Sequence, residues 1–332
     1  MRENTWVGPA GWSYEDWKGI VYPASRQRGF HEAAYLASFF CTIEINTSFY
    51  RPLKPEVARV WAHRVEHNPR FRFTAKMYRG FTHDGRMDRE SIREFCQGLD
   101  PLIEHRRLGC LLMQFPFSFR FNRENRDYLL KLKRAFSHFA LVAEMRHASW
   151  NCEEGLGVLI DNQIGFCNID QPRLHQCMPP TAHVTSVIGY VRLHGRNYLE
   201  WFNHNGSDED RGGLSHVQAR YNYLYTVSQL EQWKKRIGQV ADQTKATYVV
   251  ANNHFQGKAV VNALQLLSML TEEKVDVPED LMPFYPELLA IAQNTPAQRT
   301  LFEETPARTV GRSREARGET PALMVVAAGG RK

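Results

Sequence analysis

Short apolar segments of the chain repeatedly end in side chains that could take part in catalysis or binding. The segment CTIEINTSFY begins with a β-branched half and then presents Glu44, Asn46 and Tyr50. The same ending follows FRFTAKM, GCLLMQFP, FALVAEMRH, GFCNID, GYVRLHGR and TYVVANNH. Carboxylates can transfer protons, cations can bind anionic groups, amides can orient a substrate, and aromatic rings can form pocket walls. The candidates are the carboxylates Glu44, Glu144 and Asp170; the bases and cations Lys76, His83, Arg146, His147, Arg192, His194 and Arg196; the amides Asn46, Gln114, Asn252 and Asn253; and the aromatic residues Trp12, Tyr14, Tyr50 and Trp150.

Glu144 is the first candidate for proton transfer. Arg146 stands two positions later, so both side chains would point to the same side of one strand. An inward carboxylate could then be compensated by the arginine and act as a general base or metal ligand. The pair would equally serve as a structural ion pair inside the protein, and both interpretations stay open.

His194 is the second candidate for proton transfer. Arg192 shares its side of the strand and Arg196 follows directly, so three cationic or titratable groups gather at one strand exit. This grouping predicts an anionic ligand, with His194 as acid or base. The alternative is a hydrogen-bonded network with a purely structural role.

Lys76 and the asparagine pair have weaker assignments. Lys76, with His83 in the following loop, is expected to bind an anion, and a Schiff-base nucleophile is the less favoured alternative. Asn252 and Asn253 suit the orientation of a hydroxyl or carbonyl group, although an asparagine pair at a turn can also cap the backbone.

A divalent metal is an alternative use of the acidic residues. Glu44, Glu144, Asp170 and His194 form a suitable ligand set. The neighbouring arginines would compete for these carboxylates, so no metal is assigned.

Apolar segments of strand type alternate with helical segments over most of the chain. This alternation predicts a single (β/α)8 barrel of the TIM type over residues 1–292, in which strand exits converge at the carboxyl-terminal mouth. A doubly wound sheet is disfavoured because no GxGxxG follows the first strand. The expected strands are 5–8, 42–45, 70–76, 110–114, 140–145, 165–169, 190–193 and 247–251, and the expected helices are 31–40, 55–65, 89–104, 122–137, 153–162 and 257–270.

Two segments depart from this alternation. Residues 197–226 have a Gly/Ser/Asp-rich centre and aromatic ends, which suits either a lid over the mouth or a surface loop. Residues 293–332 lack periodicity and are predicted to be a disordered basic tail. Within the tail, Gln298, Leu301 and Phe302 resemble a short peptide that docks on the bacterial sliding clamp, which is a weak indication of that partner.

The composition is that of an ordinary globular protein, with 23% charged and 43% hydrophobic residues. No apolar segment approaches the roughly 20 residues that span a bilayer, so we expect a cytoplasmic protein without membrane contact. The six cysteines form no CxxC pair and are expected to be buried free thiols. Residues 293–332 contribute seven basic and four acidic residues, so +3 of the net +6 lies in the tail and net charge alone does not argue for nucleic-acid binding.

Eight segments of the chain form a recognisable series. In order, they are GPAGWSYEDWKGIVYP, TIEINTSFY, FRFTAKMYRGFTH, LGCLLMQFPFSF, VAEMRHASW, YVRLHGR, RYNYLYTVSQLEQW and ANNHFQGKAVVNA. Together they resemble the domain of unknown function 72 family, the YecE-like proteins, over about residues 5–270. The chain departs from the usual family pattern in its GPAGW opening and its long tail. The resemblance implies a xylose-isomerase-like barrel and no established activity.

The favoured function is an enzyme, of hydrolase or isomerase type, for an anionic substrate that carries phosphate or resembles a carbohydrate. Glu144 and His194 would transfer protons, and the remaining candidates would bind substrate. One alternative is a protein that binds nucleic acid or processes phosphodiesters, using the cations and aromatic rings of the mouth. Another is a non-catalytic module that the tail recruits to a partner.

Overall fold

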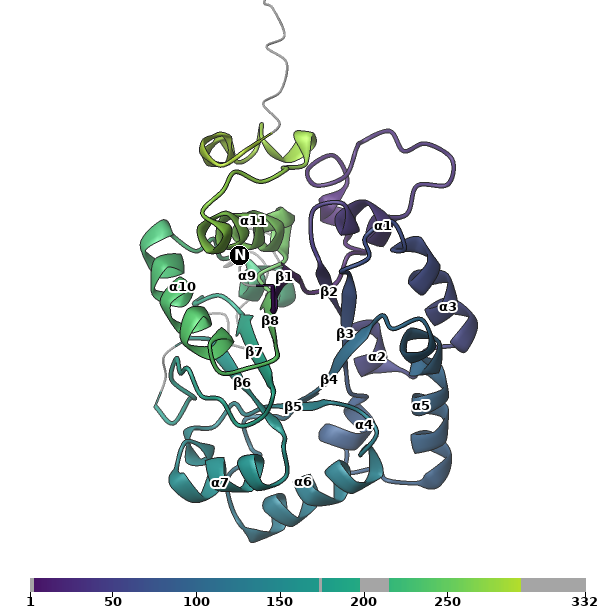
Figure 1. The fold of residues 1–332 in the computed structure, drawn as a ribbon, viewed down its shortest axis with the longest axis vertical. Helices are drawn as coiled ribbons and strands as arrows, with labels where there is room; N and C mark the ends of the chain where they lie inside the picture. The colour runs from purple at the N-terminus through teal and green to yellow at the C-terminus, as the bar shows by residue number, and fades with distance from the viewer. Residues whose placement is uncertain (1–2, 173–174, 198–214, 294–332) are drawn as a thin grey trace, which may run out of the picture. The chain divides into compact units, whose positions relative to one another are not determined.

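Eight parallel strands surround a central axis in the computed structural model, which describes residues 3–172, 175–197 and 215–293 (Figure 1). The hydrogen-bonded order is β1-β8-β7-β6-β5-β4-β3-β2, which is the sequential order of a TIM-type barrel. The predicted (β/α)8 fold is confirmed. The strands are β1 (Thr5–Pro9), β2 (Thr42–Ile45), β3 (Arg72–Lys76), β4 (Leu108–Gln114), β5 (Leu141–Glu144), β6 (Gly165–Asp170), β7 (Ile188–Leu193) and β8 (Ala246–Ala251).

The barrel is nearly closed between β1 and β2. These strands share a single isolated bridge, between Ala10 and Glu44, and the Gly11 amide donates to the Glu44 carbonyl at 2.8 Å. A Cβ at Gly8 would run into the Thr42 carbonyl oxygen, so glycine allows the two backbones to approach. Glu44 therefore stands at the seam where the barrel closes.

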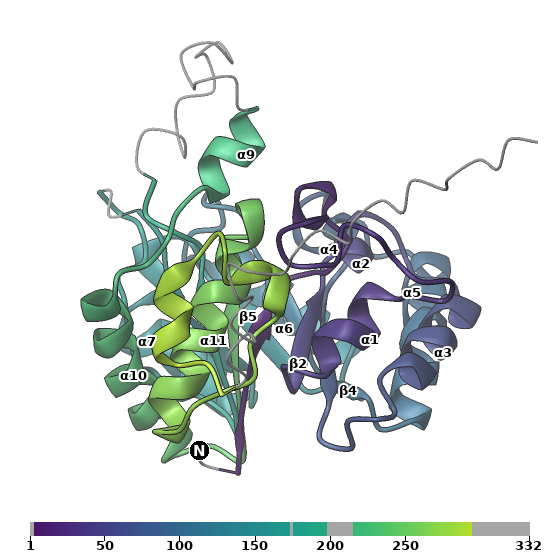
Figure 2. The same cartoon turned by 90° about the horizontal axis from the view of Figure 1, so that it is seen from above.

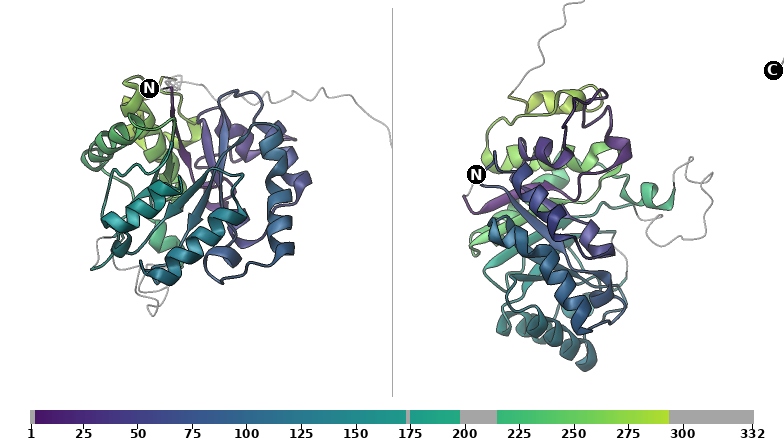
Figure 3. Two further views of the ribbon diagram at one scale, coloured as in Figure 1. Left: turned by 60° about the horizontal axis from the view of Figure 1, so that its bottom comes forward. Right: turned by 90° about the vertical axis from the view of Figure 1, so that its right-hand side faces the viewer.

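Helices pack around the strands, as the different views show (Figures 1 and 3). Side chains begin several of these helices by accepting from a backbone amide: Asp88 begins α5, Asn122 begins α6, and Thr226 with Gln229 forms a capping box at α10. The helices are α1 (Glu32–Ala37), α2 (Thr47–Tyr50), α3 (Pro55–Arg64), α4 (Arg79–Thr82), α5 (Arg89–Glu104), α6 (Arg123–Ala135), α7 (Glu153–Asp161), α9 (His216–Tyr221), α10 (Val227–Ala241) and α11 (Lys258–Thr271).

Short helices at one end of the barrel are the main departure from the predicted elements. The α2 and α4 helices directly follow β2 and β3, and together with α9 they lie at the end opposite the N-terminus (Figure 2). A helix of four residues is too short for a hydrophobic period to reveal. The long helix α10 was also not predicted.

Parts of the sequence-based expectations lie outside the described residues. These are the centre of the 197–226 excursion, residues 198–214, and nearly all of the expected tail, including Gln298, Leu301 and Phe302. Within the described ranges, no helix is both long and apolar enough to cross a membrane. All six cysteines are free, as expected, but only Cys110 and Cys167 are buried. The other four are half-buried, so the expectation of burial was wrong for them.

Candidate functional site

A pocket of about 740 Å³ lies at the carboxyl ends of the strands. Lys76, Arg79, Arg146 and Arg220 supply its charged walls, and no carboxylate is present among the described residues that line it. Its walls therefore carry positive charge on the side that meets a ligand. The remaining lining residues are Tyr14, Asn46, Phe49, Tyr50, His83, Gln114, Phe115, Pro116, Phe117, Gln171, Cys177, Tyr221, Asn252 and His254.

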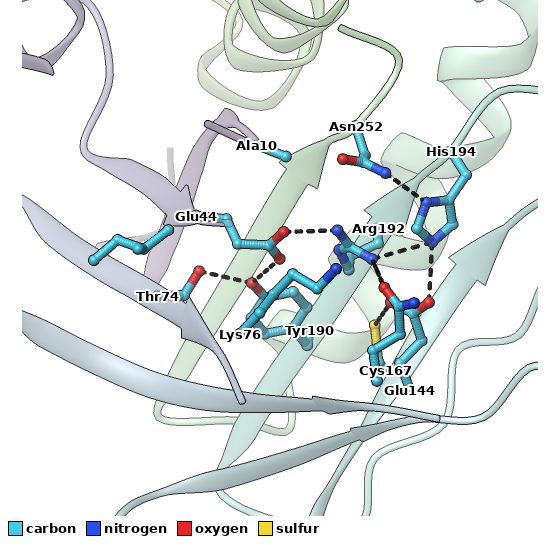
Figure 4. A network of polar contacts seen from close by, with 12 residues as sticks. Ala10, Glu44, Thr74, Lys76, Glu144, Cys167, Tyr190, Arg192, His194 and Asn252 are labelled. Carbon is cyan, nitrogen blue, oxygen red and sulfur yellow. Dashed lines mark hydrogen bonds and ion pairs between the residues drawn. The ribbon is translucent and has the colours of Figure 1, made fainter. Parts of the chain in front are cut away.

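Arg192 joins β7 to β2, β4 and β5 beneath this pocket (Figure 4). It comes from β7 and is 1% exposed. One guanidinium nitrogen, Nη2, lies 2.6 Å from Glu44 Oε1 on β2, and the other, Nη1, lies 2.7 Å from Glu144 Oε2 on β5. Nη1 also donates to Gln114 Oε1 at 3.1 Å. One arginine thus bridges two buried carboxylates on different strands, and Arg146 supplies the second positive charge at Glu144.

The second oxygen of Glu44 extends the network to β3. Tyr190 donates its hydroxyl to Glu44 Oε2 at 2.9 Å, and the same hydroxyl lies 2.7 Å from Thr74 Oγ1. Because the Tyr190 proton goes to Glu44, Thr74 donates to Tyr190. Glu44 is in this way satisfied on both oxygens and lies buried below the pocket floor.

Glu144 is surrounded by cations and a histidine. Arg146 Nη2 lies 2.6 Å from Glu144 Oε1, and His194 Nε2 lies 3.2 Å from the same oxygen. Burial alone would raise the pKa of Glu144, but Arg146 and Arg192 hold it well below its usual range. A carboxylate with so low a pKa is a weak base near neutral pH.

His194 is held as a neutral ring. Burial, and then the charge of Arg146, lowers the pKa of His194 well below its usual value. Asn252 Nδ2 lies 2.9 Å from Nδ1 and can only donate, so Nδ1 accepts and Nε2 carries the proton directed at Glu144. The ring therefore orients Glu144 from below the pocket.

Lys76 ends β3 and is 9% exposed. Within the described part of the chain its ammonium makes no hydrogen bond or ion pair, and it lies 4.1 Å from the centroid of the Phe49 ring. Burial, and then the charge of Arg192, lowers the pKa of Lys76 to about 7, with Arg146 acting in the same direction and Glu44 and Glu144 opposing. A substantial fraction of Lys76 is therefore a neutral amine at neutral pH.

Replacing Lys76 by methionine tests this environment. Between pH 7 and 10.5 the unfolded chain keeps a proton on Lys76 that the folded protein has lost, so wild-type stability rises with pH across this window. Methionine has no such proton. The free energy of unfolding of Lys76→Met, relative to that of the wild type, is thus highest below pH 7. This difference shrinks by roughly 4 kcal/mol on the way to pH 10.5. Urea unfolding of both proteins across this range measures the difference, and a difference that does not vary with pH contradicts the assignment.

Aromatic rings form the other walls of the pocket. His254 stacks on Tyr14 with ring centroids 4.3 Å apart and an interplanar angle of 9°, and it contacts Tyr221 at 4.6 Å. Burial lowers the pKa of His254 to about 4, so this ring is uncharged at neutral pH. Tyr50 is 69% exposed beside Phe49 at the pocket edge. These faces suit a planar or partly apolar ligand group.

The structure brings many of the sequence-predicted site residues together in two layers. One layer lines the pocket and the other lies directly below it. The lining layer contains Tyr14, Asn46, Tyr50, Lys76, His83, Gln114, Arg146 and Asn252, and the layer below contains Glu44, Glu144, Arg192 and His194.

Two predicted wall residues lie instead in the core. Trp12 packs edge-on against Trp61 with ring centroids 4.8 Å apart. Trp150 stacks on Phe119 and donates its indole N–H to the Phe119 carbonyl at 2.9 Å. Both are almost fully buried, so neither lines the pocket.

Other predicted site residues form their hydrogen bonds and ion pairs outside the pocket. Arg196 Nε contacts both oxygens of Asp170, at 3.1 and 2.9 Å. Asn253 donates to the Tyr223 carbonyl and to Asn262 Oδ1. His147 lies 2.8 Å from Ser149 Oγ and caps the short helix after β5.

The carboxylates of the suggested metal site already have cationic partners. Glu44 binds Arg192, Glu144 binds Arg192 and Arg146, and Asp170 binds Arg196. This donor set therefore does not fit a divalent metal. In the described ranges another group, His63, Glu66 and His105, holds its ligand atoms within 4.8 Å of one another, but it lies where α3 and α5 end and not at the mouth.

Sequence reasoning missed part of the pocket wall. Phe115, Gln171 and His254 directly continue predicted strand exits, so extending each exit by a few residues would have found them. No sequence pattern marked the more distant residues, because they reach the mouth through loops and short helices. These are Arg79, Cys177, Arg220 and Tyr221.

Residues 6–285 match the family model described as "Protein of unknown function DUF72". The UPF0759 protein YunF of Bacillus subtilis strain 168 is 28% identical over 281 residues, which cover 81% of this chain and 95% of that protein. Its name states no substrate or reaction.

Two solved structures have the same fold. A DUF72 family protein of Thermotoga maritima, TM1631, is 33% identical, with 80% of this chain and 99% of that chain covered and a TM-score of 0.68. A DUF72 family protein of Enterococcus faecalis, EF0366, is 24% identical, with 83% and 98% covered and a TM-score of 0.69. The sequence-based family assignment and barrel fold are thereby confirmed.

Proposed function

The chain belongs to the DUF72 family of proteins of unknown function, and from that premise we propose that it is an enzyme acting on an anionic small molecule held in the pocket at the barrel mouth. One observation carries the proposal. The charged side chains among the described lining residues are all basic, and Glu44 and Glu144 are buried below them and paired. The exposed Asp84 lies 3.5 Å from Arg79 but does not line the pocket, so an entering anion would gain cationic contacts without a carboxylate in the described lining.

The size and walls of the pocket support a small organic anion. About 740 Å³ lies within the range of ~300–1,000 Å³ that small-molecule sites occupy. Tyr14, Phe49 and Tyr221 offer ring faces, while Asn46, Gln114 and Asn252 offer amides for hydroxyl or carbonyl groups. A phosphate-bearing or sugar-like substrate matches this combination.

The proposal divides the roles between the two layers. Arg146, Arg79 and Arg220 bind the anionic group, and Lys76, whose pKa of about 7 leaves much of it a neutral amine, meets the reacting part of the substrate. Glu144 and His194 were predicted to transfer protons, but they lie below the pocket and Glu144 has a low pKa. Their proposed role is therefore to position Arg146.

Inorganic phosphate is the simplest probe of the proposal. We expect phosphate to raise the melting temperature of the protein relative to chloride at equal ionic strength. Arg79→Gln and Arg220→Gln should each weaken the apparent affinity by about 5–10-fold, since each removes one charge-assisted contact. Arg123→Gln, at a side chain 89% exposed on α6, is the matched control and should change nothing. Phosphate stabilisation that is absent, or equal in all four proteins, overturns the proposal.

The nucleic-acid alternative has one specific observation in its favour. Tyr50 is 69% exposed at the pocket edge and is followed by the exposed Arg51, so a base could stack there while its phosphate meets a cation. Anisotropy of labelled single- and double-stranded DNA and RNA, with the full chain at two salt concentrations, tests it. Salt-sensitive binding of nucleic acid that Tyr50→Ala weakens favours this function. Nucleic-acid binding that Tyr50→Ala does not change favours the small-molecule function. The third hypothesis, recruitment through the tail, concerns residues outside the described part.

A further inference from the structure

Lys76 occupies an unusual place for a lysine. Its side chain reaches from the end of β3 toward Arg192, into the centre of the polar network (Figure 4). Lysine side chains are rarely so buried without an acidic partner, yet within the described residues its ammonium makes no hydrogen bond or ion pair and lies over the Phe49 ring. It also lines the pocket, so a ligand can reach it.

The acidic groups nearest to Lys76 are engaged elsewhere. Glu44 is bound by Arg192 and Tyr190, and Glu144 is bound by Arg192, Arg146 and His194. Arginine forms these contacts with its planar fork, which lysine cannot match. The network therefore neutralises both carboxylates without using Lys76 and leaves the amine without an ionic partner among the described residues of the pocket wall.

The backbone at Lys76 is fixed by its neighbours. Ser48 on α2 donates its hydroxyl to the Lys76 carbonyl at 2.7 Å, and the next amide, Met77 N–H, donates to the Leu112 carbonyl at 2.8 Å. Because α2 also supplies Phe49, one short helix fixes both the strand end and the ring beside the amine. A pocket amine carried on a fixed strand end is suited to attack a bound electrophile.

We propose that Lys76 is a nucleophilic amine that forms an imine with an aldehyde or ketone group of the anionic substrate. This inference rests on the proposed function, because the anionic group would be held by the pocket arginines while the carbonyl carbon meets Lys76 Nζ. Burial and the cations Arg192 and Arg146 favour the neutral amine that the reaction requires, against the opposing charges of Glu44 and Glu144.

The chemistry needs no external oxidant or reductant. The Lys76 nitrogen lone pair forms a bond to the carbonyl carbon, and the carbonyl π electrons move to oxygen, which takes one N–H proton to give a carbinolamine. The C–O bond then breaks, and the oxygen leaves as water with the second N–H proton. The products are one imine and one water, with no change in overall oxidation state.

Pyridoxal 5′-phosphate, an anionic aldehyde, is the probe for this site. Incubation of the full-length protein with a low concentration, followed by borohydride and peptide mapping, should label Lys76 at least ten times faster than other lysines. Lys258 is the internal control, since it is partly buried but donates to Asn222 outside the pocket. Lys76→Arg, which keeps a positive charge, should lose the rapid phase. The labelling rate should reach half its maximum near pH 7, far below the ordinary lysine value of 10.5.

Two comparisons separate this inference from the proposed function. Pyridoxal without phosphate should label Lys76 more slowly, and inorganic phosphate should compete with the phosphorylated probe. Equal labelling by both aldehydes without competition supports a reactive amine and overturns the anion site. If phosphate stabilises the protein but Lys76 labels no faster than Lys258, the anion site stands and the imine inference is overturned.

Discussion

Arg192→Met is expected to lower the free energy of unfolding by about 3–5 kcal/mol, because it leaves the buried carboxylates of Glu44 and Glu144 without this arginine. Glu44 would keep only the Tyr190 hydroxyl at 2.9 Å, and Glu144 would keep Arg146 and His194. Methionine fills part of the volume but supplies no charge. The loss should therefore exceed that of an ordinary core substitution.

Urea unfolding measures this loss, and two further variants sharpen it. Arg123→Met, on the surface of α6, should change stability by less than about 0.5 kcal/mol. Adding Glu44→Gln to Arg192→Met removes one unpaired charge and should restore part of the loss, which a simple packing defect would not do. A loss below about 1 kcal/mol for Arg192→Met would show that the network does not support the barrel.

Arg146→Gln is expected to weaken phosphate binding by about 10–100-fold, the value of roughly one charged hydrogen bond. Arg146 is the residue that joins the two layers: it lines the pocket, contacts Glu144 at 2.6 Å and donates to Gln171 Oε1 at 3.0 Å. Its removal should affect binding more than the fold, because Arg192 and His194 still contact Glu144.

Arg146→Lys tests whether the shape of the guanidinium matters in addition to its charge. It keeps the charge but loses the planar fork, so its affinity should fall between those of the wild type and Arg146→Gln. Phosphate titrations followed by thermal shift give the affinities, and urea unfolding shows whether each variant is folded. Wild-type affinity in a folded Arg146→Gln protein would exclude this arginine from the anion site.

The strands could be predicted from sequence because each is a short apolar segment buried on both faces and bounded by polar residues. Thr42–Ile45 is the clearest case, since its four residues are β-branched or acidic and all are buried. The β1–β2 seam could not be predicted, because it depends on the backbone approach at Gly8. The short helices after β2 and β3 lack the length that periodicity requires.

The expectation that strand exits converge at the barrel mouth identified the correct region, but it did not predict how deeply each residue is buried. Glu144 and Arg146 were expected on one side of a single strand, but β5 ends at Glu144, which is fully buried, and Arg146 follows it and lines the pocket. The difference arises because Arg192 reaches across the barrel to both Glu44 and Glu144, a contact between residues up to 148 positions apart. Arg220 and Tyr221 were missed for a related reason, since only the folded chain brings α9 to the mouth.

Anomalous diffraction from a crystal of the full chain soaked in tungstate, a heavy analogue of phosphate, tests the anion site most directly. A strong peak is expected in the pocket within contact distance of Arg146 and either Arg79 or Arg220, and it should disappear when phosphate is added in excess. A pocket without a peak, in crystals that bind tungstate elsewhere on the surface, would contradict the anion site.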